Sequence, residues 1–539
     1  MATYQIVGPP GTGKTTTLQR QVEHDVGLHG SDAVLITSLT RAAAAEVKGR
    51  HLPLPDAQVG TLHSHCWRAL DRPELAEKRL DEWNDYAPIY AVRTDSRADL
   101  DDTSTHRADD PYAERDEGDG DQLMAHYQLL RARLTPRTLW PVEVAAFAER
   151  WETWKREADV LDFADLIDVA YETLPQAPGG PRFLYVDEGQ DHDAGELRLL
   201  HAWGQHAERL YLIADPDQCI FSWRGADPHV FRTPVPPEQR KVLSRSYRVP
   251  RAVHTLAMDW IGQIAQREPV AYEPRDAEGE VRRMEDATWR YPEPLLPAIE
   301  AETAAGKTVM VLASCGYMLR PLISLLRREG VPFHNPYRRR QGAWNPLTPG
   351  RGVSMADRLL ALLRPDEAVW GNEARFWTPQ DLKPWVEIVR ADAGLVPGAK
   401  AAIGRLGGMD SVTANDMLGW FSHEALTELF VKDPLGWLER AVLTAKARSL
   451  EFPLTVARAR GAAVLREEPK VIVSTIHACK GGESDTVMVF PDLSFAGAAD
   501  WAVGGERQDA IVRMMYVAAT RARETLIVCG AGSANAVAL

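Results

Sequence analysis

The sequence predicts an α/β protein with two parallel β-sheets, each interrupted by a mainly helical insertion. Short β-branched and aliphatic runs recur with helical patterns between many of them, an alternation typical of parallel sheets covered by helices. With 539 residues and 45% hydrophobic content, the chain is too long for one core, so about two to four domains are expected. The predicted strands lie at residues 3–7, 33–37, 183–186, 210–214, 309–313, 471–474, 486–490 and 525–529.

Charge and cysteine content narrow the class of protein. A formal net charge of -14 excludes a protein that coats nucleic acid with its whole surface, so any DNA site must be a local groove. The cysteines are widely spaced and none forms a CxxC pair, which disfavours disulfides and zinc and suits a reducing cytoplasm. No basic leader and no run of ~20 apolar residues is found, so we expect a soluble cytoplasmic protein without membrane contact.

Two insertions and a tail separate the predicted strands. The first insertion spans residues 67–159, and its stretch 95–122 is so rich in Asp, Glu, Arg and Gly that a disordered, solvated loop is expected. The second spans residues 341–465, and patterns such as that of residues 355–363 predict a small helical domain. Residues 531–539 have the low-complexity composition of a flexible tail.

A glycine-rich loop, GPPGTGKT at residues 8–15, lies between a predicted strand and a helical pattern. Glycines let backbone N–H groups converge on phosphate oxygens, and the helix N-terminus adds positive potential. Lys14 would reach the β and γ phosphates, and the Thr15 hydroxyl would bind Mg²⁺. The expected nucleotide-binding residues of this segment are Gly8, Pro9, Pro10, Gly11, Thr12, Gly13, Lys14, Thr15 and Thr16.

A second phosphate-handling element is the apolar run FLYV at residues 183–186, followed by Asp187 and Glu188. Parallel sheets place their chemistry at the carboxyl ends of their strands. There Asp187 would hold Mg²⁺ through water, and Glu188 would polarise the attacking water. Hydrolysis also needs positive charge at the γ phosphate, for which Arg248 and Arg521 are the candidates.

The order of motifs resembles that of the UvrD/Rep-type superfamily 1 DNA helicases, and the likeness covers most of the chain apart from the insertions. The segments that carry it are LTRAAA (39–44), GTLHS (60–64), LDFADL (161–166), DEGQD (187–191), ADPDQCIFSWRGA (214–226), SYR (246–248), STIHACKGGESD (474–485) and YVAATRA (516–522).

This resemblance implies two RecA-like P-loop NTPase domains. The first would comprise residues 1–66 and 160–275, and the second residues 276–340 and 466–530. It also implies an ATP-dependent DNA helicase that moves on single-stranded DNA, 3′ to 5′, with ATP and Mg²⁺ as cofactors. The expected partners are single-stranded DNA, junctions of single- and double-stranded DNA, and unidentified repair or replication proteins.

The resemblance assigns roles around the nucleotide. Gln218 would sense the γ phosphate, Arg521 would reach it, and Arg248 would meet the phosphates. Tyr247 would stack on the base, and Glu483 would recognise the ribose. The expected catalytic residues are Lys14, Glu188, Gln218, Arg248 and Arg521.

The same resemblance predicts the DNA contacts. Phe221 and Trp223 would stack on bases, an interaction worth ~1–3 kcal/mol per base and indifferent to sequence. Thr475 and His477 would contact the DNA backbone. The full set of expected DNA-binding residues is Thr40, Arg41, Thr61, His63, Phe221, Trp223, Arg224, Thr475 and His477.

Some positions depart from the family pattern. Gly189 replaces Phe, and Gly482 and Ser484 replace Leu and Phe, while the family's glutamine motif upstream of the phosphate loop is missing from the sequence. Adenine selectivity is therefore left open. These departures keep a second hypothesis in view, a nucleotide-binding DNA-binding module or assembly factor without unwinding activity.

Overall fold

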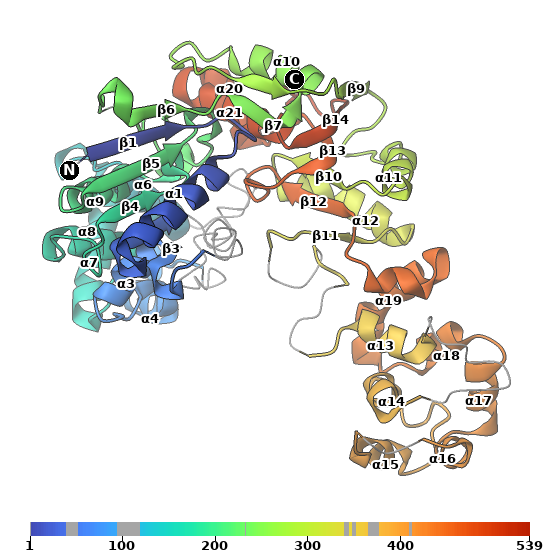
Figure 1. Cartoon of the computed structure of the whole chain (residues 1–539). Coiled ribbons are helices and arrows are strands. Elements are labelled where there is room, and N and C mark those ends of the chain that lie inside the picture. The colour runs from blue at the N-terminus through green and yellow to red at the C-terminus, as the bar shows by residue number, and fades with distance from the viewer. Residues whose placement is uncertain are drawn as a thin grey trace. The chain divides into compact units, whose positions relative to one another are not determined.

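The computed structural model describes residues 2–38, 52–93, 119–231, 233–338, 344–347, 352–364, 377–408 and 412–539. It is an α/β structure in which the paired strands of both sheets run parallel, as predicted (Figure 1). Contacts divide the chain into two compact units. The first contains Met1–Glu285, Leu312–Tyr317 and Thr475–Leu539, and the second contains Asp286–Val311 and Met318–Ser474. These boundaries differ from those of the predicted motor domains, which stay a prediction.

The first unit contains a six-stranded sheet in the order β3-β2-β4-β5-β1-β6 and a row β13-β14-β9. Its strands are β1 (Ala2–Val7), β2 (Val34–Ser38), β3 (Val59–Thr61), β4 (Phe183–Val186), β5 (Arg209–Ala214), β6 (Arg240–Val242), β7 (Arg245–Pro250), β8 (Glu273–Arg275), β9 (Glu280–Met284), β13 (Ser484–Val489) and β14 (Ala522–Cys529). Its helices are α1 (Lys14–His29), α3 (Leu62–Ala69), α4 (Leu80–Tyr86), α6 (Asp119–Ala132), α7 (Val142–Ala158), α8 (Phe163–Thr173), α9 (Ala194–Gly204), α10 (Arg251–Ile261), α20 (Phe495–Val503) and α21 (Gly505–Ala519).

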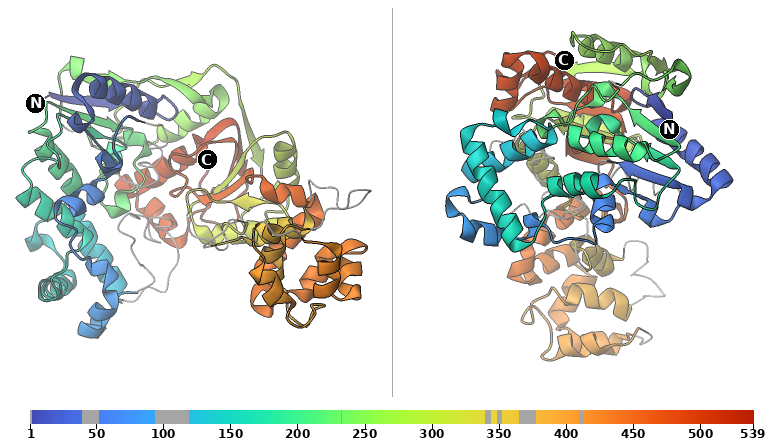
Figure 2. Two further views of the ribbon diagram at one scale, coloured as in Figure 1. Left: turned by 60° about the horizontal axis from the view of Figure 1, so that its bottom comes forward. Right: turned by 90° about the vertical axis from the view of Figure 1, so that its left-hand side faces the viewer.

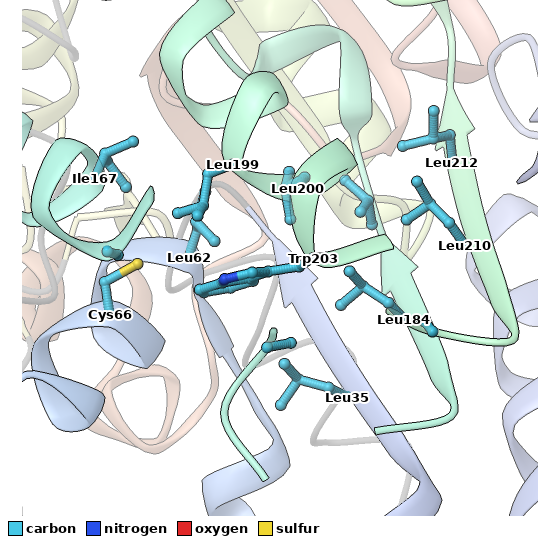
Figure 3. Close-up of a cluster of buried hydrophobic side chains, with 14 of the residues drawn as sticks. Leu35, Leu62, Cys66, Ile167, Leu184, Leu199, Leu200, Trp203, Leu210 and Leu212 are labelled. Carbon is cyan, nitrogen blue, oxygen red and sulfur yellow. The ribbon is translucent and has the colours of Figure 1, made fainter. Parts of the chain in front are cut away.

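Helices cover both faces of this sheet. Alternate side chains of each strand point to opposite faces, so apolar side chains on each face need a helix to pack against. Phe183 and Tyr185 of β4 pack with Leu18 of α1 on one face. Leu184 packs on the other face with Trp203 of α9, beside residues of α3 and α8 (Figure 3). Burial on both faces explains why β4 reads as a continuous apolar run.

The first insertion is built from α4, α6 and α7 around an aromatic core. Trp83, Phe147, Trp151 and Trp154 are buried there with Tyr127. The charged stretch expected to be a disordered loop partly belongs to this insertion's secondary structure, because residues 119–122 lie in α6. Residues 95–118 lie outside the described part of the chain.

The second unit contains the row β11-β12-β10 and a group of helices, which both views of Figure 2 draw in yellow to orange. Capping boxes begin three of these helices, at Ser354, Thr378 and Thr413. Its elements are α11 (Leu295–Ala304), β10 (Val309–Ala313), α12 (Arg320–Arg328), β11 (Phe333–His334), α13 (Met355–Leu363), α14 (Pro379–Val386), α15 (Ala399–Arg405), α16 (Ala414–Trp420), α17 (His423–Phe430), α18 (Pro434–Ala441), α19 (Thr444–Arg460) and β12 (Val471–Thr475).

The C-terminal residues differ from the expected flexible tail. Asp492, itself fully buried, accepts hydrogen bonds from the Gly532 N–H and the Ser533 hydroxyl. Val537 and Leu539 are 6% and 5% exposed, and the Leu539 carbonyl accepts a hydrogen bond from Arg283. The low-complexity composition could not predict these contacts, because they are made mainly by backbone groups and two apolar side chains.

Two further features bear on the predicted class of protein. Cys66, Cys219, Cys315, Cys479 and Cys529 are all buried, and no disulfide joins any two of them. Among the residues that the structure describes, no helix combines the length and apolar character that crossing a membrane requires.

Candidate nucleotide and DNA site

The glycine-rich loop joins β1 to α1, and its shape depends on the absence of side chains. Gly11 and Gly13 have φ values of 73° and 82°, which glycine adopts without strain. A Cβ on Gly8 would lie 2.5 Å from Lys14 Cγ, and one on Gly11 would lie 2.4 Å from Arg248 Cβ. No side chain caps Gly13 at the start of α1, so the first N–H groups of this helix are left for an anion.

The segment around β7 supports the loop from behind. The Pro10 carbonyl accepts hydrogen bonds of 2.9 Å from both the Ser246 hydroxyl and the Tyr272 hydroxyl. The Gly11 carbonyl accepts one of 2.8 Å from the Tyr247 N–H. The Tyr247 side chain itself is 72% exposed, so its ring is accessible to a stacking partner.

The predicted carboxylates follow β4, and one of them, Glu188, feels the positive charge of Lys14. Asp187 is 3% exposed, and Glu188 has a φ of 51°, an uncommon value for a residue with a side chain and one that often marks a functional site. Burial favours the neutral acid, but the charges of Lys14 and Lys480 outweigh it and lower the pKa of Glu188 to about 2. Glu188 is therefore ionised at neutral pH.

Gln218 and Arg521, 303 residues apart in sequence, are joined directly. The Arg521 Nη2 donates a hydrogen bond of 2.9 Å to Gln218 Oε1, and the Gln218 amide donates one of 2.6 Å to Asp215. Arg521 is 1% exposed. Its other N–H groups are held by the carbonyls of Val517 and Gly482, so the guanidinium is fixed in place.

Lys480 extends this network toward the carboxylates. Its ammonium donates three hydrogen bonds of 2.6 Å, to both oxygens of Asp191 and to the Gln218 carbonyl. It also lies 4.0 Å from Glu188 and 5.4 Å from the centre of the Phe221 ring. One cation thus contacts the carboxylate motif, the glutamine motif and an expected DNA-binding residue.

Two more residues that were expected to bind the nucleotide, Arg248 and Glu483, contact each other. Arg248 Nε donates a hydrogen bond of 2.6 Å to Glu483, and Arg523 lies 3.4 Å from the other oxygen of Glu483. The two residues expected to meet the phosphates and the ribose thus lie together in the same unit.

Most of the expected DNA-binding residues are buried in this structure. The exposed fractions are 2% for Thr61, 8% for His63, 6% for Phe221, 0% for Thr475 and 3% for His477. Trp223 and Arg224 are half-buried, and Thr40 and Arg41 lie outside the described residues.

Phe221 differs from the expected stacking surface. Its ring packs against Trp223 at 6.4 Å and against His477 at 6.0 Å, so it offers no open face and the accessible aromatic surface is left to Trp223. Burial lowers the pKa of His477 to about 3, which keeps the ring neutral.

His63 and Arg224 both approach Glu196 on α9. Glu196 is 1% exposed, and its oxygens lie 3.5 Å from His63 and 3.9 Å from Arg224. His192 contacts it at 3.0 Å. Burial lowers the pKa of His63 to about 4, against the opposing charge of Glu196. This cluster joins the GTLHS and WRGA segments through a buried carboxylate.

Sequence reasoning did not single out Lys480, Asp191, Asp215 or Glu196. Lys480 and Asp191 lie inside motifs that carry the family resemblance, so their position was a usable signal. Glu196 gave no such signal, since it follows the carboxylate motif on a separate helix.

Comparisons with known proteins agree with these motifs. Residues 2–234 match the family model of the UvrD/REP helicase N-terminal domain. The chain is 25% identical to a probable DNA helicase II homolog of Mycoplasma pneumoniae, over 48% of this chain and 40% of that protein. It is 25% identical to the ATP-dependent DNA helicase PcrA of Staphylococcus epidermidis, over 49% of this chain and 38% of the relative.

A longer match is to the ATP-dependent DNA helicase UvrD2 of Mycobacterium tuberculosis, with 24% identity over 96% of this chain and 75% of the relative. The matches to the Mycoplasma and Staphylococcus proteins span 40% and 38% of those relatives. Residues 2–234 include the glycine-rich loop, the carboxylates and the ADPDQCIFSWRGA segment, so the comparisons support the resemblance where its phosphate motifs lie.

Proposed function

We propose that this UvrD/Rep-type helicase protein is an ATP-driven motor that moves on single-stranded DNA and separates duplex DNA. The observation that carries the proposal is the hydrogen bond between Arg521 and Gln218, in the same compact unit as Lys14 and Glu188. Each of these residues handles phosphate in the proposed reaction. Arg521 is held among carbonyl oxygens rather than carboxylates, which leaves its charge available to an anionic ligand.

The proposed roles follow from charge and position. Lys14 binds the β and γ phosphates, and Glu188, ionised at neutral pH, orients and polarises the attacking water. Arg521 and Arg248 stabilise the negative charge that develops on the transferred phosphoryl group. Gln218 contacts the γ phosphate and transmits its presence to Lys480 through its own backbone carbonyl.

The residues present also suit ATP and Mg²⁺. The glycine positions that cannot accept a Cβ leave a backbone cradle for phosphate oxygens. The Thr15 hydroxyl is an oxygen ligand of the kind that Mg²⁺ prefers, and the Asp187 carboxylate would hold the ion through water. Mg²⁺, when bound there, would neutralise phosphate charge. Tyr247 would stack on the base, and Glu483 would accept hydrogen bonds from the ribose.

The direction of movement is proposed as 3′ to 5′, on the aromatic WRGA segment and on the KG of the later motif. Trp223 would supply the stacking surface for bases, with His63, Arg224, Thr475 and His477 positioning the strand. We further propose that the protein acts at junctions of single- and double-stranded DNA in the cytoplasm, where the thiols of its buried cysteines would stay reduced.

ATP hydrolysis by purified protein, with and without single-stranded DNA, tests the motor directly. Wild-type protein should hydrolyse ATP faster when DNA is present. Lys14→Ala should lower kcat by at least about a hundredfold, because it removes charge from the transition state, while DNA binding measured by fluorescence anisotropy stays largely intact. Lys241→Ala, at an exposed position of β6, is the matched control. Absence of DNA-stimulated hydrolysis in the wild type would overturn the proposal.

Strand displacement separates unwinding from the alternative of a DNA-binding module. With ATP present in both reactions, a duplex with a 3′ single-stranded tail should be unwound and one with a 5′ tail should not; without ATP neither should be unwound. The opposite preference would refute the proposed direction. ATP binding without displacement of either duplex would favour the module or assembly factor.

A further inference from the structure

A small pocket of about 110 Å³ lies in the first unit, away from the glycine-rich loop. Its walls include Pro216 and Asp217, which precede Gln218, together with Phe231, Arg267 and Arg513. A cavity needs roughly 10–15 Å³ of such volume to hold one water. The pocket is therefore large enough for several waters or one small anion, and too small for a nucleotide.

Arg513 of α21 is a buried cation without a counter-charge in contact. It is 8% exposed, and its buried Nε has no hydrogen-bond partner. Within the described ranges of the chain, no ion pair or hydrogen bond holds its guanidinium. Asp509, one turn earlier, has its pKa raised by burial and feels the charge of Arg513 as an opposing effect, but the two do not form an ion pair.

The unpartnered guanidinium of Arg513 contrasts with that of Arg521. Arg521 is buried still more deeply, at 1% exposed, yet four oxygen acceptors hold its N–H groups. An arginine cannot lose its proton in a protein, and a buried charge without a partner is unfavourable because it has lost its hydration. Arg513 therefore gains most from an anion that enters the pocket.

Arg267 provides a second guanidinium with fixed orientation. Its Nε lies 2.9 Å from both oxygens of Asp217, and its Nη2 lies 2.7 Å from one of them. Asp217 balances the charge of Arg267, so the unbalanced charge in the pocket is that of Arg513. Glu268 also lines the pocket, but it is largely exposed and pairs with Arg240.

We propose that this pocket is a binding site for a small oxyanion and that it takes inorganic phosphate. Guanidinium groups match tetrahedral oxyanions through paired N–H donors, and phosphate carries enough charge to balance Arg513. This site is distinct from the glycine-rich loop and does not depend on the proposed motor activity. Because Asp217 precedes Gln218, occupancy of the pocket would act one residue from the hydrolysis site.

Isothermal titration of the Lys14→Ala chain with phosphate tests the proposal, because that substitution weakens phosphate binding at the glycine-rich loop. With chloride as reference at equal ionic strength, one phosphate should bind per chain. Arg513→Gln in the same background should weaken phosphate at least tenfold. Arg507→Gln, on the same helix but with a side chain 66% exposed, should leave the affinity unchanged.

A second variant keeps the test decisive if Arg513→Gln does not fold. Gln266 is an exposed lining residue, so Gln266→Trp should cover the pocket and block phosphate without removing a buried charge. Circular dichroism checks the fold of each variant. No phosphate binding to the Lys14→Ala chain, or binding that survives Gln266→Trp in a folded protein, would overturn the assignment.

Discussion

Replacing Lys480 by Met tests how far the buried network depends on one cation. The substitution removes the ammonium that donates three hydrogen bonds of 2.6 Å to Asp191 and the Gln218 carbonyl. It leaves Asp191, 3% exposed, without its counter-charge. Removing one partner of a buried pair costs about 3–5 kcal/mol, so we expect the free energy of unfolding to fall by that amount near pH 8.

The loss of stability in Lys480→Met should depend on pH. The titration of Asp191 decides whether that loss grows or shrinks as pH rises. Burial raises the pKa of Asp191 from 3.8 to about 6, against the opposing charge of Lys480. A group with a raised folded-state pKa contributes stability that is present below its unfolded-state pKa and lost as pH rises through its folded-state pKa. In Lys480→Met the pKa of Asp191 rises further. The free energy of unfolding of the variant should therefore continue to fall as pH rises above 6. In the wild type the titration of Asp191 is complete there, so it lowers stability no further.

Urea unfolding followed by circular dichroism, at about pH 5.5 and pH 8, measures both effects. Lys241→Met, at an exposed position, controls for loss of a lysine. Adding Asp191→Asn to Lys480→Met should restore most of the stability at pH 8, because no buried charge is then unpaired. A deficit of less than about 1 kcal/mol for the single variant, set against the magnitude expected for a buried pair, would refute the reasoning, as would a deficit independent of pH.

Two further substitutions test the loop and the core. Gly11→Ala places a Cβ 2.4 Å from Arg248 Cβ at a φ of 73°, so ATP affinity in a fluorescent-nucleotide titration should fall at least tenfold. Gly27→Ala, which meets no atom within 4 Å, should leave it unchanged; equal effects would contradict the argument. Trp203→Ala, at a side chain 1% exposed, should lower the free energy of unfolding by about 3–5 kcal/mol, and a loss below 1 kcal/mol in urea unfolding would show that the core relaxes around it.

The central strands were predictable because burial on both faces leaves a plain apolar run, as at Phe183–Val186. The edge strands were missed for the opposite reason. β6 and β9, which end their rows, read RKV and EVRRM. An edge strand exposes much of its length to solvent, so polar residues there carry no periodic apolar signal.

Within the site, local motifs predicted residues whose chemistry depends on sequence neighbours, such as Lys14 in its glycine-rich loop. They could not reveal the pair of Lys480 and Asp191, 289 residues apart, because only the fold brings those elements together. They also could not tell that the ring of Phe221 lies buried beneath His477 and Lys480. A motif gives the type of side chain but not the face that it presents.

The buried cysteines make this chain convenient for single-molecule work. Thiol-specific dyes react with the thiolate, and burial raises the pKa of Cys219 and Cys479 to about 12 and that of Cys66 and Cys529 still higher. The side chain of Cys315 is fully covered as well. A cysteine introduced at an exposed position such as Ala502 of α20 would therefore take up a fluorophore while the native thiols stay unlabelled, without a cysteine-free background.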